Sequence, residues 1–111
     1  MMNYMTLTDK SALPCFYVPK TLFTSKNYQT VSADSKLLYG LLLEKTRVNK
    51  ITSNGDLMGR DFVLFSKKDL AQELGYSEKN TLKFIKELEN VYLVKKVNQH
   101  GEILHYSVKK V

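Results

Sequence analysis

The residues with the most evident chemistry open the second of two short segments with helical spacing. Ser77, Glu78, Lys79, Asn80 and Lys83 stand together at its start. On a helix in the DNA major groove, an asparagine can pair with adenine and a lysine with guanine, and each good pair adds roughly 1–3 kcal/mol of discrimination between bases. The same residues could instead form an ordinary solvated face, with Ser77 acting only as a cap. The elements that position them decide between the two interpretations.

The surrounding sequence predicts a helix, a tight turn and a second helix. Ser66 and Asp69 have the Ser-x-x-Asp spacing of a capping pair, so we expect the first helix over 67–74. Gly75 supplies the left-handed residue that ends it. We expect the second helix over 78–90. In a helix-turn-helix, the first part of the second helix reaches the base edges.

The apolar residues of this second helix suggest which side faces the core. Leu82, Ile85 and Leu88 recur every three positions, and we expect them to point inward. Phe84 lies off this stripe and is expected to pack against the first helix or the hairpin that follows. No glycine follows the helix, so Asn90 is the residue expected to take left-handed geometry at its end.

Two segments with alternating apolar residues come next, at 93–97 and 103–108. They predict a β-hairpin with Asn98-Gln-His-Gly-Glu102 at its tip. A short apolar run at 62–65 predicts one further, buried strand. Together these elements predict an α+β fold: a winged helix-turn-helix with a small helical core and a C-terminal β-hairpin wing.

The N-terminal part of the chain is expected to complete this core. We divide the chain into a flexible arm at 1–15 and a single domain at 16–111, and expect Cys15 to be buried. A single helical turn is predicted at 20–23. The helix predicted at 33–48 is apolar almost all round. It is therefore either the central helix of the domain or a helix with one face covered by a second protomer.

Further candidates lie in the first helix, later in the second helix and in the hairpin. The remaining candidates for DNA contact are Lys67, Lys68, Lys86, Lys95, Lys96 and His100. The two lysines that open the first helix are placed where phosphate contacts are expected, next to free backbone N–H groups. At least one of the two lysines in the hairpin should face the DNA backbone. The histidine at the hairpin tip either touches a minor groove or is a plain exposed turn residue.

Composition limits the possible functions further. Seventeen Lys and Arg against eleven Asp and Glu give a net charge of +6, which favours a polyanionic partner such as DNA. A single cysteine excludes an intrachain disulfide, and neither histidine has the neighbours that a metal site needs. No nucleophile–base set or phosphate-binding loop is visible, so we expect no enzyme activity, no metal and no cofactor. No signal peptide or membrane span is visible, so we expect a soluble, cytoplasmic protein.

Several motifs resemble the N-terminal domain of plasmid replication initiators of the RepA_N type. The motifs are Phe16-Tyr-Val-Pro-Lys-Thr-Leu-Phe23, Ser35-Lys-Leu-Leu-Tyr-Gly-Leu-Leu-Leu43, Asn54-Gly55, Phe65-Ser-Lys-Lys-Asp-Leu-Ala-Gln-Glu-Leu-Gly75 and Lys86-Glu-Leu88 before Leu93-Val94. The first two are specific, because winged helices in general lack them. The chain departs from the family pattern at Tyr92, where glycine is usual, and in a hairpin tip that is less basic.

The resemblance implies a domain that binds double-stranded DNA at repeated origin sites (iterons) and helps to start theta-type plasmid replication. It also implies a homodimer on those sites, and contacts with host replication proteins through a further C-terminal region. Two alternatives stay open from the residues alone. One is a stand-alone winged-helix transcriptional regulator, and the other is a winged helix used only for protein–protein assembly.

Overall fold

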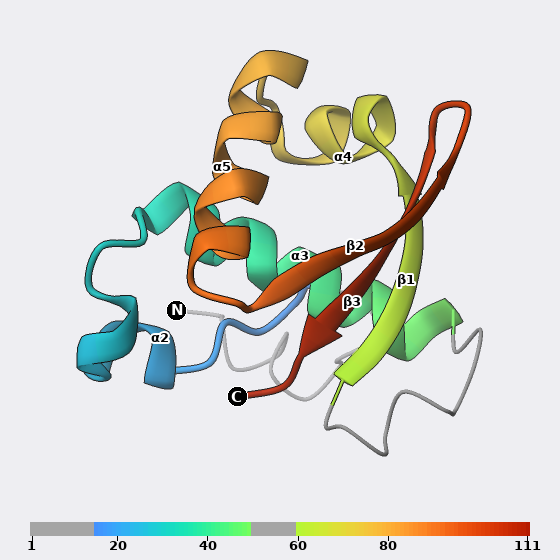
Figure 1. Cartoon of the computed structure of the whole chain (residues 1–111). Coiled ribbons are helices and arrows are strands. Elements are labelled where there is room, and N and C mark those ends of the chain that lie inside the picture. The colour runs from blue at the N-terminus through green and yellow to red at the C-terminus, as the bar shows by residue number, and fades with distance from the viewer. Residues whose placement is uncertain (1–14, 50–59) are drawn as a thin grey trace, which may run out of the picture.

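The computed structural model describes residues 15–49 and 60–111, and Figure 1 shows how their elements are arranged. The helices are α2 (Thr21–Thr24), the 3-10 turn η2 (Lys26–Tyr28), α3 (Ala33–Asn49), α4 (Lys67–Leu74) and α5 (Glu78–Asn90). The strands are β1 (Arg60–Ser66), β2 (Val94–His100) and β3 (Ile103–Lys109). The predicted arm at 1–15 and the Asn54-Gly55 motif lie outside the described residues, except for Cys15. That cysteine is exposed, so the prediction that it is buried was wrong.

The three strands form one antiparallel sheet with the order β1-β3-β2. The predicted hairpin and the predicted buried strand are therefore parts of the same sheet, and all three strands are longer than predicted. Only two residues, Gly101 and Glu102, join β2 to β3. Gly101 makes this tight turn possible because it adopts a positive φ of 61°, which two-residue hairpin turns favour. Figure 1 shows the hairpin turn projecting beside α4, with α3 passing behind the sheet.

The core lies between one face of this sheet and the helices. Alternate residues of β3, namely Leu104, Tyr106 and Val108, are buried against α3 and α5. Their neighbours across β1, Val63 and Phe65, are buried with them, as expected for a sheet with one covered face. The predicted winged helix with a small helical core and a β-hairpin wing is confirmed.

α3 is the central helix of the described fold. Leu38, Tyr39 and Leu42 are each fully buried, which agrees with the interpretation of this helix as internal. Leu37 is the exception, because 42% of it is exposed. Lys36 is mostly buried, and its ammonium group lies 4.4 Å from the centre of the Phe23 ring, a cation–π contact.

Both helices of the helix-turn-helix end in the same backbone motif. After α4, the amide of Gly75 donates to Gln72 and that of Tyr76 donates to Ala71, with Gly75 left-handed at a φ of 75°. These are the two hydrogen bonds of a Schellman motif, in which the left-handed position is usually glycine.

After α5, the amide of Tyr92 donates to Glu89 and that of Leu93 donates to Leu88, the same two bonds one helix later. The left-handed residue here is Tyr92, with a φ of 64°. Asn90, which we expected to take this conformation, is instead the last residue of the helix. The chain thus holds a tyrosine in a left-handed position of the kind that glycine usually occupies.

Replacing this tyrosine by glycine should stabilise the domain. A side chain in left-handed geometry costs roughly 1–2 kcal/mol, so Tyr92→Gly should raise the free energy of unfolding by about 1 kcal/mol. Asn90→Gly is the matched control and should lower it slightly, because Asn90 is helical. Urea unfolding of the two variants tests this. A gain for Asn90→Gly with a loss for Tyr92→Gly would show that the helix ends earlier.

Candidate nucleic-acid interface

Two serine caps fix where the helices of the motif begin. The Ser66 hydroxyl accepts a hydrogen bond from the Asp69 amide, and the Ser77 hydroxyl accepts one from the Asn80 amide, each at 3.0 Å. α4 and α5 therefore begin and end where the sequence predicted. Ser77 is thus a cap whether or not it also contacts DNA. The acidic residue Glu78 lies in the first turn of α5, where it is favoured by the helix dipole.

α5 buries one stripe and exposes the opposite one. The buried residues are Thr81, Phe84, Ile85 and Leu88. At about 100° per residue, the positions opposite this stripe are Lys79, Lys83 and Lys86, and all three are exposed. We call these three the lysine face. Two predicted candidates for base contact therefore lie side by side on the helix, one turn apart, with a third lysine continuing the line.

The prediction that Leu82 faces the core was wrong. It is 41% exposed and lies on the side of α5 that faces the hairpin, one turn after Glu78. Asn80 lies on the opposite side of the helix, next to the lysine face, and its side chain is exposed. Thr81 occupies the inward position instead, and its hydroxyl donates to the Ser77 carbonyl at 2.9 Å.

Glu87 fastens α5 to the start of α3. Its Oε1 accepts the Ser32 amide at 2.9 Å and the hydroxyl of the buried Ser35 at 2.8 Å. Partial burial raises the pKa of Glu87, but these hydrogen bonds outweigh that effect, and together with the nearby Lys83 they lower the pKa below its ordinary value. From the sequence alone, this glutamate has no evident structural role. Its partners are more than 50 residues away, so local spacing carried no signal for the contact.

This contact should make the domain sensitive to acid. Because the folded pKa of Glu87 is below its ordinary value near 4.5, the stability it adds is present above that pH and is lost as pH falls through the folded pKa. Glu87→Gln should lower the free energy of unfolding by about 1 kcal/mol at pH 7, and the difference from wild type should shrink toward pH 4. Urea unfolding at both pH values tests this. Glu102→Gln, an exposed hairpin change, should show no such difference, and an equal loss there would contradict it.

Tyr76, in the turn between the helices, is a second long-range connection. Its hydroxyl donates to Asp34 Oδ1 at 2.6 Å, and its ring packs edge-on against Phe84 with 5.1 Å between centroids. The hydrogen bond to Asp34, with burial and the negative charge of that carboxylate, raises the pKa of Tyr76 to about 12. The hydroxyl is therefore engaged within the protein, and Tyr76 connects the turn to Asp34 and to Phe84.

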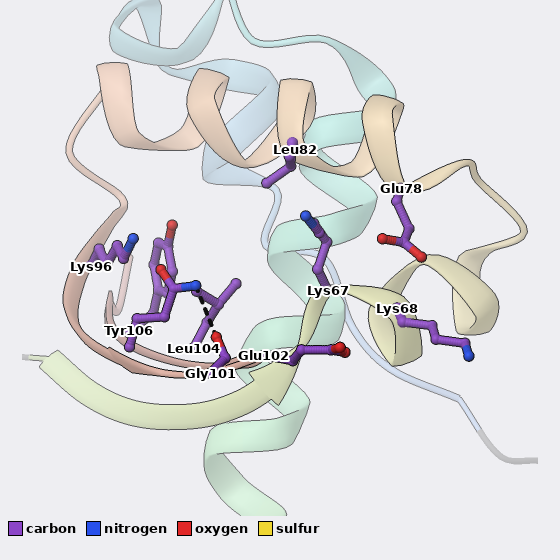
Figure 2. A pocket seen from close by; sticks show the side chains of 10 residues that line it. Lys67, Lys68, Glu78, Leu82, Lys96, Gly101, Glu102, Leu104 and Tyr106 are labelled. Carbon is purple, nitrogen blue, oxygen red and sulfur yellow. Dashed lines mark hydrogen bonds between the residues drawn. The ribbon is translucent and has the colours of Figure 1, made fainter.

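A cavity of about 570 Å³ lies between α5, the start of α4 and the hairpin. We call it the wing cavity, and Figure 2 shows it from close by. Three lysines are among the residues that line it: Lys67, Lys68 and Lys96. Glu78 and Glu102 bring two carboxylates to the same space. The cavity thus joins three predicted phosphate-contacting lysines with the first residue of α5.

The hairpin places the remaining candidates differently. Lys95 and Lys96 are both exposed, but Lys96 lines the wing cavity and Lys95 does not. His100 is exposed near the hairpin turn, with its Nε2 3.2 Å from Asn98 Nδ2. The structure therefore brings Lys67, Lys68, Lys96 and Glu78 together and leaves His100 at the tip.

Within 15–49 and 60–111, no group of three or more His, Cys, Asp or Glu side chains is placed to hold a metal ion. The same part of the chain has no helix with the length and apolar character needed to cross a bilayer.

Comparison with known proteins places this arrangement in a family. No curated protein sequence matches the chain. Similar solved structures include one described as a Rep–DNA complex, with 24% identity and a TM-score of 0.73, covering 95% of this chain and 81% of that one. Another, described as the N-terminal domain of a DNA-binding protein, has 22% identity and a TM-score of 0.72 and covers 100% of this chain and 85% of that one.

A third similar structure is described as that of an MDR initiator. It has 27% identity and a TM-score of 0.72, and it covers 96% of this chain and 85% of that one. The family described as the N-terminus of replication initiator protein A (RepA) matches residues 15–103, which is most of the chain. The chain therefore belongs to the RepA_N family of replication initiator N-termini.

Proposed function

We propose that this domain binds double-stranded DNA in a sequence-specific way at repeated origin sites (iterons), as a homodimer, and so starts theta-type plasmid replication. The observation that carries the proposal is the lysine face. α5 is packed against α3, α4 and β2 along one stripe, while its opposite stripe offers Lys79, Lys83 and Lys86 to solvent. Membership of the RepA_N family and the likeness to a Rep–DNA complex support the same proposal.

The proposed contacts divide into two kinds. Lys79, Lys83 and Asn80 contact base edges, because they project from the first part of the second helix. Lysines at the edge of this surface position the duplex by contacting phosphates, which fix register but carry no sequence information. In this group we place Lys67, Lys68, Lys86, Lys95 and Lys96, with His100 directed at the minor groove.

Binding that depends on phosphates must weaken with salt. If each protomer neutralises about four phosphates, the slope of log affinity against log salt should be near −3.6 per protomer. We would measure binding of the chain to a duplex carrying the plasmid's repeated sites and to a random duplex, at several salt concentrations. Weak binding to both duplexes even at low salt would contradict the proposal and favour a role in protein assembly alone.

Two variants separate the two kinds of contact. Lys67→Ala should weaken binding to all duplexes by a similar factor and make the slope shallower by about 0.9. Asn80→Ala should instead relax base preference at one position and leave binding to random duplex nearly unchanged. Equal losses on specific and random duplex for both variants would contradict the assignment of α5 as the recognition helix.

A further inference from the structure

Leu82 stands out among the exposed residues of α5, all of which the structure describes. The other exposed positions of this helix are polar: Glu78, Lys79, Asn80, Lys83, Lys86 and Asn90. One exposed leucine is ordinary on a protein surface. What distinguishes Leu82 is its location, because it lines the wing cavity between α5 and the hairpin.

The floor of the wing cavity is apolar and its rim is charged. Leu82 shares the cavity with Leu104 and Tyr106 of β3, and Figure 2 shows Leu82 directed from α5 toward the side on which these two residues lie. Tyr106 is held in place because its hydroxyl donates to Glu89 Oε2 at 3.1 Å. An apolar group of a ligand that enters this cavity would therefore meet Leu82 with the ring of Tyr106 held in place beneath it.

The charges on the rim indicate where a DNA strand would pass. Lys67 and Lys96 come from α4 and β2, on different sides of the cavity, and both attract phosphate. The rim also carries two carboxylates: Glu78, one turn before Leu82, and Glu102 at the hairpin turn. Each repels phosphate from the part of the cavity next to it. A strand passing between α5 and the hairpin would thus keep its backbone near the lysines and turn a base edge toward Leu82.

Thymine is the base with an apolar group on that edge. Its 5-methyl group projects into the major groove beside the backbone of its own strand, and aliphatic side chains are suited to contact it. None of the other three bases has a methyl group on the major-groove edge, and a leucine cannot satisfy the hydrogen-bond donors and acceptors that they present there.

We propose that Leu82 is a specificity-determining residue that contacts the 5-methyl group of one thymine in the bound site. The inference rests on the proposed function, since it requires α5 to lie in the major groove. Removing a single buried methyl group should weaken binding about threefold to fivefold.

The test is a methyl-deletion scan of the DNA. Duplexes that bind the 111-residue chain are first selected from a random pool, and each thymine of the best duplex is then replaced in turn by deoxyuridine. Wild type should lose about threefold to fivefold at one position and little at the others. Leu82→Ala should bind the thymine duplex about as weakly as wild type binds that uridine duplex, and should show no further loss with uridine. Leu64→Ala, at a β1 leucine that is 40% exposed, is the matched control and should keep the wild-type profile.

The outcomes separate this inference from the function on which it rests. If the chain selects no duplex, the proposed function fails and this inference fails with it. If the chain selects a duplex but no uridine substitution matters, or if Leu82→Ala keeps the wild-type uridine profile, the inference alone is overturned. Should Leu82→Ala unfold, Leu82→Gln keeps the side-chain length while removing the apolar contact, and it should lose the same uridine sensitivity.

Discussion

Replacing Lys79, Lys83 and Lys86 together by alanine should lower the affinity for duplex DNA by about a hundredfold or more at low salt. Each good pair between a lysine and a base is worth about 1–3 kcal/mol, and losing two such pairs together with one phosphate contact reaches this range. Because Lys86 is the one of the three that we place on a phosphate, the slope of log affinity against log salt should also become shallower by about 0.9. Titrations of one labelled duplex at several salt concentrations measure both effects.

A second triple variant controls for net charge. Lys20, Lys26 and Lys109 are also exposed, and replacing them lowers the charge from +6 to +3 in the same way. They belong to the start of α2, to η2 and to the end of β3, at the end of the molecule opposite the hairpin turn (Figure 1). This variant should lose little affinity. Equal losses for the two triples would mean that overall charge, rather than the lysine face, determines binding.

The position of the lysine face on α5 could be predicted in part, because the residues that begin and end a helix are recognisable in the local sequence. The serine caps and the glycine after the first helix fixed the bounds of α4 and α5 from the sequence. The strands were also located, but their joining into one sheet was not, since strand pairing depends on residues far apart in the chain. β1 pairs with β3 across about 40 residues.

The error at Leu82 has a geometric cause. Residues three apart on a helix differ by about 60° in direction, so Leu82 and Leu88 point about 120° apart and cannot both face the core. The buried stripe alternates steps of three and four, through Thr81, Ile85 and Leu88. The stripe begins with Thr81, a polar residue that sequence analysis does not count as apolar. It is nevertheless fully buried, because its hydroxyl donates to the Ser77 carbonyl within the helix.

The two most specific sequence motifs turn out to be in contact, and a glycine makes the contact possible. A Cβ atom on Gly40 of α3 would lie 2.9 Å from each of three atoms: Phe16 Cδ1, the Tyr17 carbonyl oxygen and Val18 Cγ2. Real Cβ contacts are not this short, so the extended segment from Phe16 to Val18 can lie on α3 only where the helix has no side chain. The sequence showed both motifs, but not that each requires the other.

Gly40→Ala should therefore destabilise the domain by about 2 kcal/mol. Overpacking of this kind costs about 3 kcal/mol where a backbone oxygen is among the atoms displaced, and the better helix propensity of alanine offsets about 1 kcal/mol of it. The sign of the effect is the decisive observation, because in a helix with free space the same change stabilises by up to about 1 kcal/mol. Urea unfolding of wild type and variant measures it.

A double-mutant cycle then locates the cause. Phe16→Ala removes one of the two contacting side-chain atoms but leaves Val18 Cγ2 and the Tyr17 carbonyl oxygen in place. Gly40→Ala should consequently cost less in the Phe16→Ala background than in wild type, yet still more than zero. A stabilising Gly40→Ala, or no coupling between the two positions, would contradict the packing of this segment on α3. The glycine in the second motif would then need an explanation other than close approach of the first.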